Sequence, residues 1–389
     1  MSSSGEAAVV RRARAEDVES ILDLLAHYDM PRSYFEPFYL KDPSYVPEHS
    51  WVAEQDGRLA AHIRVFDCRV RACGTELRVA GVGNVITALD QRGRGHAGRL
   101  LEAMLAGTPG EGFAYSLLKA YQPVLYERHD WAHIDQELVR ATLSPGGVAT
   151  VAIERFADED LPEVMRLYDE TNAGRSGTTV RSPEYWRSQL EWLNEDRQGF
   201  LVARKQSGVF GGYVRSRAAR DAVETLELGL GAGDSGAGRA LLSAAASRRG
   251  GWLQAFLPPS LLRLFQPHEG EVTTEFGFMG RVLDLPTLTT ALEPVWLRRV
   301  QESGGRGGSF QLATSAGSAE VWVSDEEVQL DTSGVGETAD ALDEGEFAHL
   351  PFCRFDAAAG KRFGARSDSP LLRTLFPEQD FVIWRSDAF

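Results

Sequence analysis

The chain has 389 residues, which exceeds the size at which one hydrophobic core keeps growing, so two or three domains are expected. Its 41 Lys and Arg against 56 Asp and Glu give a net charge of -15, which argues against nucleic acid as the main partner because phosphate backbones bind positive surfaces. An acidic surface suits a cationic or amine ligand, and it also serves solubility alone.

The cysteines and the start of the chain predict where the protein works. Cys68, Cys73 and Cys353 form an odd, sparse set without a CxxC pair, so neither a disulfide framework nor a cysteine zinc site is expected. The first residues lack an apolar signal segment, and no stretch reaches the ~18 apolar residues of a membrane span. A soluble protein of the reducing cytoplasm is expected.

The sequence repeats itself at a nearly constant offset. A short β-like run, an acidic cap and an amphipathic helix begin at Val9 and again at Ala152, 143 positions later. A glycine turn that opens an apolar helix occurs at Gly95 and at Gly236, 141 positions later. Two matches in register predict a duplicated domain.

Between these landmarks the first half has the pattern of an α+β fold. Three runs separated by DG and CG turns predict an antiparallel meander: WVAEQ, RLAAHIRVFDCRVRA and ELRVAGVGNVITAL. A helix from Gly95 to about Ala106 follows, then a strand at FAYSLL, a short helix at QPVLYER and a strand at ELVRATL. Strands and helices in this order predict a mixed sheet, with SPGG at 144–147 as a linker into the second copy.

The last part of the chain has a different composition. Residues 307–353 contain ten Asp or Glu and no Lys or Arg, and VWVS and EVQLD read as two strands about a DE turn. The end, FVIWRSDAF, combines a β-like run with a terminal phenylalanine, which predicts a docked tail because unanchored ends fray. Three domains are therefore expected, over residues 1–147, 148–287 and 288–389.

The glycine turn in DQRGRGHAGRLL (90–101) is a candidate phosphate-binding loop. Arg92, Gly95 and Ala97 stand between a predicted strand and a helix. Glycine lets backbone approach an oxygen, the first helical N–H groups are unpaired, and the helix dipole favours an anion. The pattern therefore suits a pyrophosphate, while a plain turn with solvated arginines is an equally good interpretation of the spacing alone.

Two other phosphate-binding motifs are weaker matches. A P-loop needs a lysine that this turn lacks. Gly93, Gly95 and Gly98 approach the dinucleotide pattern GxGxxG, but the preceding strands form a meander, and no acidic residue closes a second strand about 20 residues on. Coenzyme A is the ligand that the context favours.

At this turn the sequence resembles the GNAT acetyltransferases, whose acetyl-CoA loop has Arg or Gln, two residues, Gly, one residue, and Gly or Ala. The layout of two GNAT-like halves, of which the second is degenerate, and a small third domain is similar to the enhanced intracellular survival (Eis) family of N-acetyltransferases. The resemblance implies a sterol-carrier-like third domain and a homo-oligomer, a hexamer built as a ring of trimers. It implies acetyl-CoA as co-substrate, no metal, and an amine-bearing small molecule or lysine side chain as acceptor.

The resemblance also assigns the cofactor site. It implies that the backbone of Val85, Ile86 and Thr87 pairs with the pantetheine arm, and that residues 93–98 take the pyrophosphate. The expected cofactor-binding residues are Val85, Ile86, Thr87, Arg92, Gly93, Arg94, Gly95, His96, Ala97, Gly98, Tyr121 and Gln122. Tyr121 and Gln122 depart from the small or acidic pair of the family, so the channel wall is expected to differ.

LYERHDW supplies the expected catalytic acid. By resemblance, Tyr126 protonates the departing thiolate, and the terminal carboxylate of Phe389 is the base. The chemistry needs such a pair, because an alkylammonium near pKa ~10 cannot attack a thioester until it loses a proton. Asp29, Glu36 and Asp387 could attract the amine, or be solvated carboxylates.

Other functions and a degenerate second site are also considered. His129 and His133 have an i, i+4 spacing similar to that of zinc hydrolases, so a metal-dependent hydrolase is one alternative, and a noncatalytic CoA-binding protein is another. In the second half Gly233, Asp234 and Ser235 replace Arg92, Gly93 and Arg94. A carboxylate repels phosphate, so this half is not expected to bind CoA.

Overall fold

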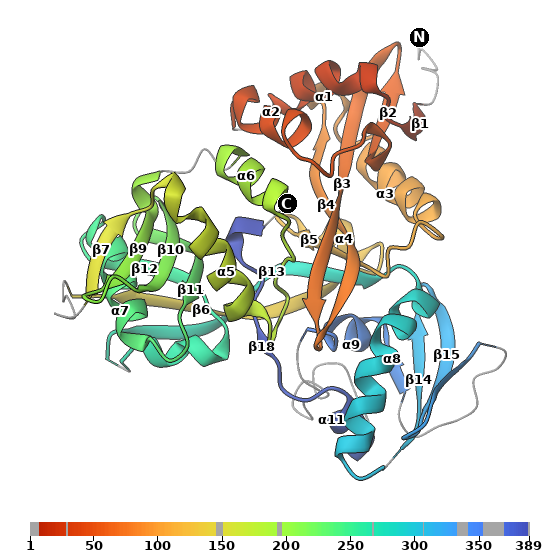
Figure 1. Cartoon of the computed structure of the whole chain (residues 1–389). Coiled ribbons are helices and arrows are strands. Elements are labelled where there is room, and N and C mark those ends of the chain that lie inside the picture. The colour runs from red at the N-terminus through yellow and green to blue at the C-terminus, as the bar shows by residue number, and fades with distance from the viewer. Residues whose placement is uncertain are drawn as a thin grey trace.

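The computed structural model of the chain is an α/β protein built around one large mixed sheet (Figure 1). The structure describes residues 8–28, 30–144, 151–192, 197–266, 268–305, 307–332, 341–352 and 369–387. Most of the expected SPGG linker, Asp29, Cys353 and Phe389 lie outside these residues. Within them, no helix is long and apolar enough to cross a membrane.

The first half has the elements that the sequence predicts, and an additional helix, α2. They are β1 (Val9–Arg12), α1 (Val18–Leu25), α2 (Arg32–Leu40), β2 (Ser50–Gln55), β3 (Arg58–Ala72), β4 (Thr75–Thr87), α3 (His96–Gly107), β5 (Tyr115–Lys119), α4 (Pro123–Glu127) and β6 (Ala132–Thr142). Three β-like runs separated by DG and CG turns specify the β2–β4 meander, which the structure confirms.

The second half runs through a matching series of elements. They are β7 (Val151–Arg155), α5 (Leu161–Asn172), β8 (Arg175–Ser176), α6 (Pro183–Trp192), β9 (Phe200–Lys205), β10 (Phe210–Ala218), β11 (Val223–Leu230), α7 (Ser235–Ser247), β12 (Trp252–Phe256) and β13 (Gly270–Val282). Each half has one parallel strand pair at the same place, β4 with β5 and β11 with β12. The order of elements agrees with the repeat in the sequence.

The two halves share one twelve-stranded sheet by exchanging their last strands. Its order is β1-β2-β3-β4-β5-β13-β6-β12-β11-β10-β9-β7. Strand β13 of the second half lies between β5 and β6, and β6 of the first half pairs with β12 of the second. A boundary at residue 147 therefore divides the sequence, whereas the hydrogen-bonded sheet is continuous across it.

A smaller third unit follows the shared sheet. It comprises α8 (Leu285–Glu302), β14 (Gly308–Thr314), β15 (Gly317–Val323), β16 (Val328–Asp331), β17 (Ala341–Asp343), α9 (Glu344–His349) and α11 (Pro370–Leu375). Its four-stranded sheet has the order β16-β15-β14-β17, and Trp296 of α8 packs edge-on against Phe310 with ring centroids 5.7 Å apart. The predicted strand pair about the DE turn is confirmed as β15 and β16.

The end of the chain leaves the third unit and docks against the shared sheet and the second half (Figure 1). Strand β18 (Asp380–Phe381) pairs in parallel with β8, and the backbone N–H of Ile383 donates to Gln136 Oε1 at 2.7 Å. Trp384 is buried, and its Nε1 donates to Asn172 Oδ1 at 3.1 Å. The predicted docked tail is confirmed as far as Asp387, although only Asp380 and Phe381 form a regular strand.

Candidate active site

Strands β4 and β5 separate at the centre of the first half and leave an open strand edge. Their parallel pairing runs from Val79–Tyr115 to Val82–Leu118. Strand β4 then continues to Thr87, whereas the chain leaves β5 after Lys119 and enters α4. Backbone N–H and C=O groups on such an edge need another partner, so the end of β4 can pair with an extended polar ligand.

A β-bulge directs the end of β4. Between the pairs Arg64–Gly83 and His62–Ile86, β4 has one residue more than β3. Asn84, within this bulge, has a left-handed backbone conformation with φ of 51°, which asparagine tolerates better than most residues. A bulge bends its strand and reorients the groups that follow, here Val85 and the residues after it.

His62 stabilises this bulge from inside the protein. Its Nδ1 lies 3.0 Å from the carbonyl oxygen of Asn84, which can only accept, so Nδ1 carries the proton and donates. Burial lowers the pKa of His62 to about 3, and the imidazole is therefore neutral at physiological pH.

The turn before α3 has the expected features of an anion cradle. Gly93 and Gly95 have φ of 78° and 77°, and a Cβ added at either would meet nothing within 4 Å. No side chain caps the helix, so the first N–H groups of α3 have no side-chain acceptor. The open space above the two glycines and the uncapped helix suit a pyrophosphate.

The side chains of this turn differ in their accessibility. Arg92 and Arg94 are exposed, and Arg92 Nε donates a long hydrogen bond of 3.4 Å to the carbonyl of Thr87. His96 is 2% exposed, and its Nδ1 accepts from Arg99 at 2.7 Å. The side chain of His96 therefore neither faces water nor lines the cradle; only its backbone N–H is a candidate for phosphate binding.

The corresponding turn of the second half contains an acidic side chain, Asp234, at the N-terminus of its helix. Asp234 caps α7 by accepting from the N–H of Ala237 at 3.0 Å. Its carboxylate also pairs with Lys205 Nζ at 2.8 Å. An acidic group thus occupies the place that a phosphate would take, which supports the expectation that this half does not bind CoA.

Tyr126 lies on α4, which begins just after the strand edge opens. Its side chain is 8% exposed and packs against Trp131, and its hydroxyl has no hydrogen-bond partner within the described residues. Burial raises the pKa of Tyr126 to about 12, so the phenol is protonated at neutral pH. It is a weaker acid than the ordinary pKa of about 10 implies, and it acts first as a hydrogen-bond donor.

Two further tyrosines line the approach to Tyr126. The hydroxyl of Tyr28 donates to the carbonyl of Val85, so this expected pantetheine acceptor already has one partner. Tyr121 is 82% exposed, and Lys119 Nζ lies 5.0 Å from the centre of its ring. Gln122 follows as the N-cap residue of α4. Tyr28 was not predictable from the sequence, because nothing in its local pattern distinguishes it from a core aromatic residue.

The two histidines that suggested a hydrolase are not on one helix. His129 lies in the turn after α4, and His133 lies on β6 with its Nε2 2.9 Å from Glu127 Oε1. The helical i, i+4 geometry of a zinc site is therefore not present here. No group of three His, Cys, Asp or Glu side chains in the described ranges is arranged to hold a metal ion.

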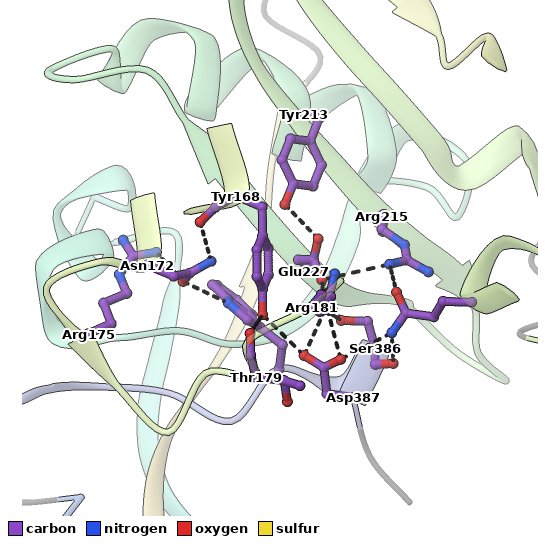
Figure 2. A network of polar contacts seen from close by, with 12 residues as sticks. Tyr168, Asn172, Arg175, Thr179, Arg181, Tyr213, Arg215, Glu227, Ser386 and Asp387 are labelled. Atoms are coloured by element: carbon purple, nitrogen blue, oxygen red, sulfur yellow. Dashed lines mark hydrogen bonds and ion pairs between the residues drawn. The ribbon is translucent and has the colours of Figure 1, made fainter. Parts of the chain in front are cut away.

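A buried polar network anchors the tail beside the sheet (Figure 2). Arg181 lies at its centre and donates to Glu227, to Ser386 Oγ at 2.9 Å, and to both oxygens of Asp387 at 2.7 and 2.9 Å. The guanidinium also packs against the rings of Tyr168 and Trp186, with its Cζ 4.0 and 4.3 Å from the ring centroids. Burial alone would raise the pKa of Glu227, but Arg181 and Arg215 outweigh it, and the pKa is lowered.

The network changes the interpretation of the acidic residues that were candidate amine ligands. Asp387 is buried and fully engaged by Arg181, so it is neither solvated nor available to an acceptor. Glu36 accepts from Arg32 at 2.9 Å on α2. Glu227, in the apolar run LELGL, is the one member of the network that a sequence signal could have found, because a lone carboxylate in such a strand needs a buried partner.

The region of residues 9–134 matches the acetyltransferase (GNAT) domain family. It contains the separated strands, the uncapped helix α3 and Tyr126. GNAT acetyltransferases use acetyl-CoA, and the cradle described above fits its pyrophosphate.

The whole chain is similar to several acetyltransferases. An uncharacterised N-acetyltransferase of Streptomyces coelicolor is 27% identical over 183 residues, which are 43% of this chain and 44% of that protein. A GCN5-related N-acetyltransferase from Kribbella flavida covers 100% of both chains with a TM-score of 0.71 and 17% identity. Eis1 from Mycobacterium abscessus covers 98% of this chain and all of its own, with a TM-score of 0.69 and 15% identity. The two structural likenesses establish the fold.

Proposed function

We propose that the protein is an acetyl-CoA-dependent N-acetyltransferase that acts on a primary amine, with aminoglycosides, polyamines and lysine as the acceptor classes to test. The observation that carries the proposal is the open edge of β4 beside the uncapped N-terminus of α3, with Tyr126 in the next helix, α4. These features lie within the GNAT domain.

The cofactor-binding residues follow from this arrangement. The backbone of Val85, Ile86 and Thr87 would pair with an extended pantetheine arm along the open edge of β4. The N–H groups of residues 93–98, together with Arg92 and Arg94, would bind the pyrophosphate, as backbone donors and charge-assisted donors do at helix N-termini. Tyr121 and Gln122 would line the channel between these groups and Tyr126.

Acetyl-CoA supplies a thioester. The amine nitrogen bonds to the thioester carbonyl carbon, and the C–S bond breaks. In the same reaction the amine loses a proton and the sulfur gains one. Tyr126 is the group that would donate to the sulfur, because its hydroxyl is protonated and has no partner within the described part of the chain. The carboxylate of Phe389, which lies outside the described residues, is proposed as the base by family resemblance alone.

The test is thiol release from acetyl-CoA with a panel of aminoglycosides, polyamines and lysine peptides, with the product identified by mass. Acceptor-dependent thiol release with one acetyl group added to nitrogen is the expected result. CoA binding without turnover on any amine would instead support the noncatalytic alternative. The proposed homo-oligomer is tested on the same sample by analytical ultracentrifugation.

A further inference from the structure

A group of cationic side chains lies where β5 leads into α4. Lys119 interacts electrostatically with Arg385 of the tail, and Arg385 interacts with Arg217 of β10. The carboxylate that all three share is Glu224 of β11. In a protein with a net charge of -15, this cationic cluster (Lys119, Arg217 and Arg385) is a local excess of positive charge.

The carboxylate of Glu224 is already paired with Arg217. Arg217 binds Glu224 through two nitrogens, with Nε and Nη2 at 2.7 and 2.6 Å from Oε2. Arg385 approaches the other oxygen only with Nε, at 3.4 Å and without hydrogen-bond geometry. The charge of Glu224 is thus mainly neutralised by Arg217, which leaves Lys119 and Arg385 without a full counter-ion among the described residues.

Arg385 has donors that no group in the described part of the chain accepts. Its side chain is 16% exposed, and its guanidinium lies 4.7 Å from the ring centre of Phe256. Both Nε and Nη1 lack a hydrogen-bond partner. Burial lowers the pKa of Arg385. A guanidinium nevertheless stays charged in proteins, so Arg385 is a cation that can bind an anionic group.

The buried network holds this arginine in place. Ser386 and Asp387, the next two residues, both bind Arg181, and the carbonyl of Ser386 accepts from Gln189 at 2.8 Å (Figure 2). Trp384, on the other side, is bonded to Asn172. Arg385 is therefore presented from a fixed backbone, which is the condition for a specific binding group rather than a mobile surface charge.

The cationic cluster adjoins the candidate active site. Tyr121, whose ring centre lies 5.0 Å from Lys119 Nζ, is close to Arg385 and to Tyr28. Tyr28 in turn is close to Tyr126, and its hydroxyl donates to the carbonyl of Val85. A small molecule that reaches Tyr126 past Tyr121 thus comes close to Lys119 and Arg385.

We propose that the cationic cluster is a subsite for an anionic group on the acceptor, so that the preferred substrate is an amine that also carries a carboxylate or a phosphate. This rests on the proposed acetyltransferase function and narrows its acceptor class. Polyamines and aminoglycosides, which bring only positive charge to Lys119 and Arg385, are then poor substrates.

The test compares amines that differ only in an anionic group. Cadaverine is paired with lysine, putrescine with ornithine, and ethanolamine with phosphoethanolamine, and kcat/KM is measured for thiol release from acetyl-CoA. The anionic member of a pair is expected to be at least ~10-fold better, the usual size of a charge-assisted contact. The first two pairs report on carboxylate and the third on phosphate.

Variants connect the preference to the cationic cluster. Arg385→Gln and, separately, Lys119→Gln should raise KM for the anionic amines about tenfold and leave cadaverine and putrescine nearly unchanged, and Arg385→Lys should restore part of the preference. Arg69→Gln on β3 is the control, because that side chain is 70% exposed and pairs only at 3.8 Å with Glu76. Two variants on different elements separate loss of the subsite from a disturbed tail.

Each outcome decides the proposal. Equal kcat/KM for the two members of each pair would overturn the proposal. A loss of kcat/KM in the variants that affects both members alike would overturn it as well. Equal use is also the result expected if the chain end, four residues beyond Arg385 in the sequence, filled the subsite. If no amine releases thiol, the proposed function fails separately; Arg385-dependent binding of lysine over cadaverine in calorimetry would then still support the subsite, and absence of binding would refute it.

Discussion

Arg181 and Asp387, 206 positions apart in the sequence, form two parallel hydrogen bonds of 2.9 and 2.7 Å in the interior of the protein. This pair connects the segment before α6 to the end of the chain. Glu227 binds the same guanidinium and also lies 3.8 Å from Arg215, so two arginines compensate the two buried carboxylates. The pair is therefore what fixes the tail that carries Arg385.

Arg181→Gln should lower the free energy of unfolding by about 3–5 kcal/mol, because it leaves Asp387 buried without a counter-ion and removes the nearer of the two arginines beside Glu227. Urea unfolding measures this change. The same variant should release the tail, so limited trypsin should cut after Arg385 much faster, as mass spectrometry detects. Arg166→Gln on the exposed side of α5 is the control and should change neither quantity; a tail equally protected in both variants would contradict the anchoring role.

His62→Gln should alter how stability depends on pH. The pKa of His62 is about 3 in the folded protein and about 6.5 in the unfolded chain. Between these pH values the unfolded state binds one proton more than the folded state, so the wild type loses stability as the pH falls below 6.5. From pH 7 to 5.5 the loss from this group is on the order of 1 kcal/mol. The decrease in the free energy of unfolding between the two pH values, measured by urea unfolding, should be smaller in the variant by this amount. An equal decrease in variant and wild type would show that His62 is not responsible.

Tyr126→Phe should reduce kcat by about 10²–10⁴-fold, the usual range for loss of a proton donor. Affinity for acetyl-CoA should stay within about twofold, because the ring still packs against Trp131. Since the pKa of Tyr126 is about 12, the wild-type rate should show no loss from this group up to pH 10. Steady-state kinetics and CoA calorimetry check the change; an unchanged kcat would remove Tyr126 from the mechanism.

CoA should bind once per chain, in the first half alone. Gly95→Ala should abolish or strongly weaken binding, because it adds a Cβ to the cradle and strains a backbone with φ of 77° by ~1–2 kcal/mol. Gly233→Ala is a matched control with φ of 73° in the corresponding turn of the second half, and it should leave CoA affinity unchanged. Calorimetry that finds two sites, or a Gly233 variant with half the sites, would refute the assignment.

The local elements of the GNAT domain were predictable from the sequence. Three β-like runs separated by DG and CG turns specify the meander of β2 to β4, and the helix after Gly95 is observed as His96–Gly107. The glycine turn was correctly placed at a helix start, and its copy at Gly236 showed the repeat. These features depend on residues close together in the chain, where backbone preference and hydrophobic periodicity act.

The tertiary structure decided what these elements do together. The local sequences of β6 and β13 do not predict that each strand pairs with strands of the other half, because strand pairing depends on which edges meet in space. The burial of His96, the pairing of Arg181 with Asp387 and the convergence of Lys119 with Arg385 are likewise contacts between distant segments. The sequence by itself determined the elements and the glycine turn before α3, because these arise from short-range interactions. The folded chain alone decided which charges are neutralised, because that depends on partners far away in the sequence.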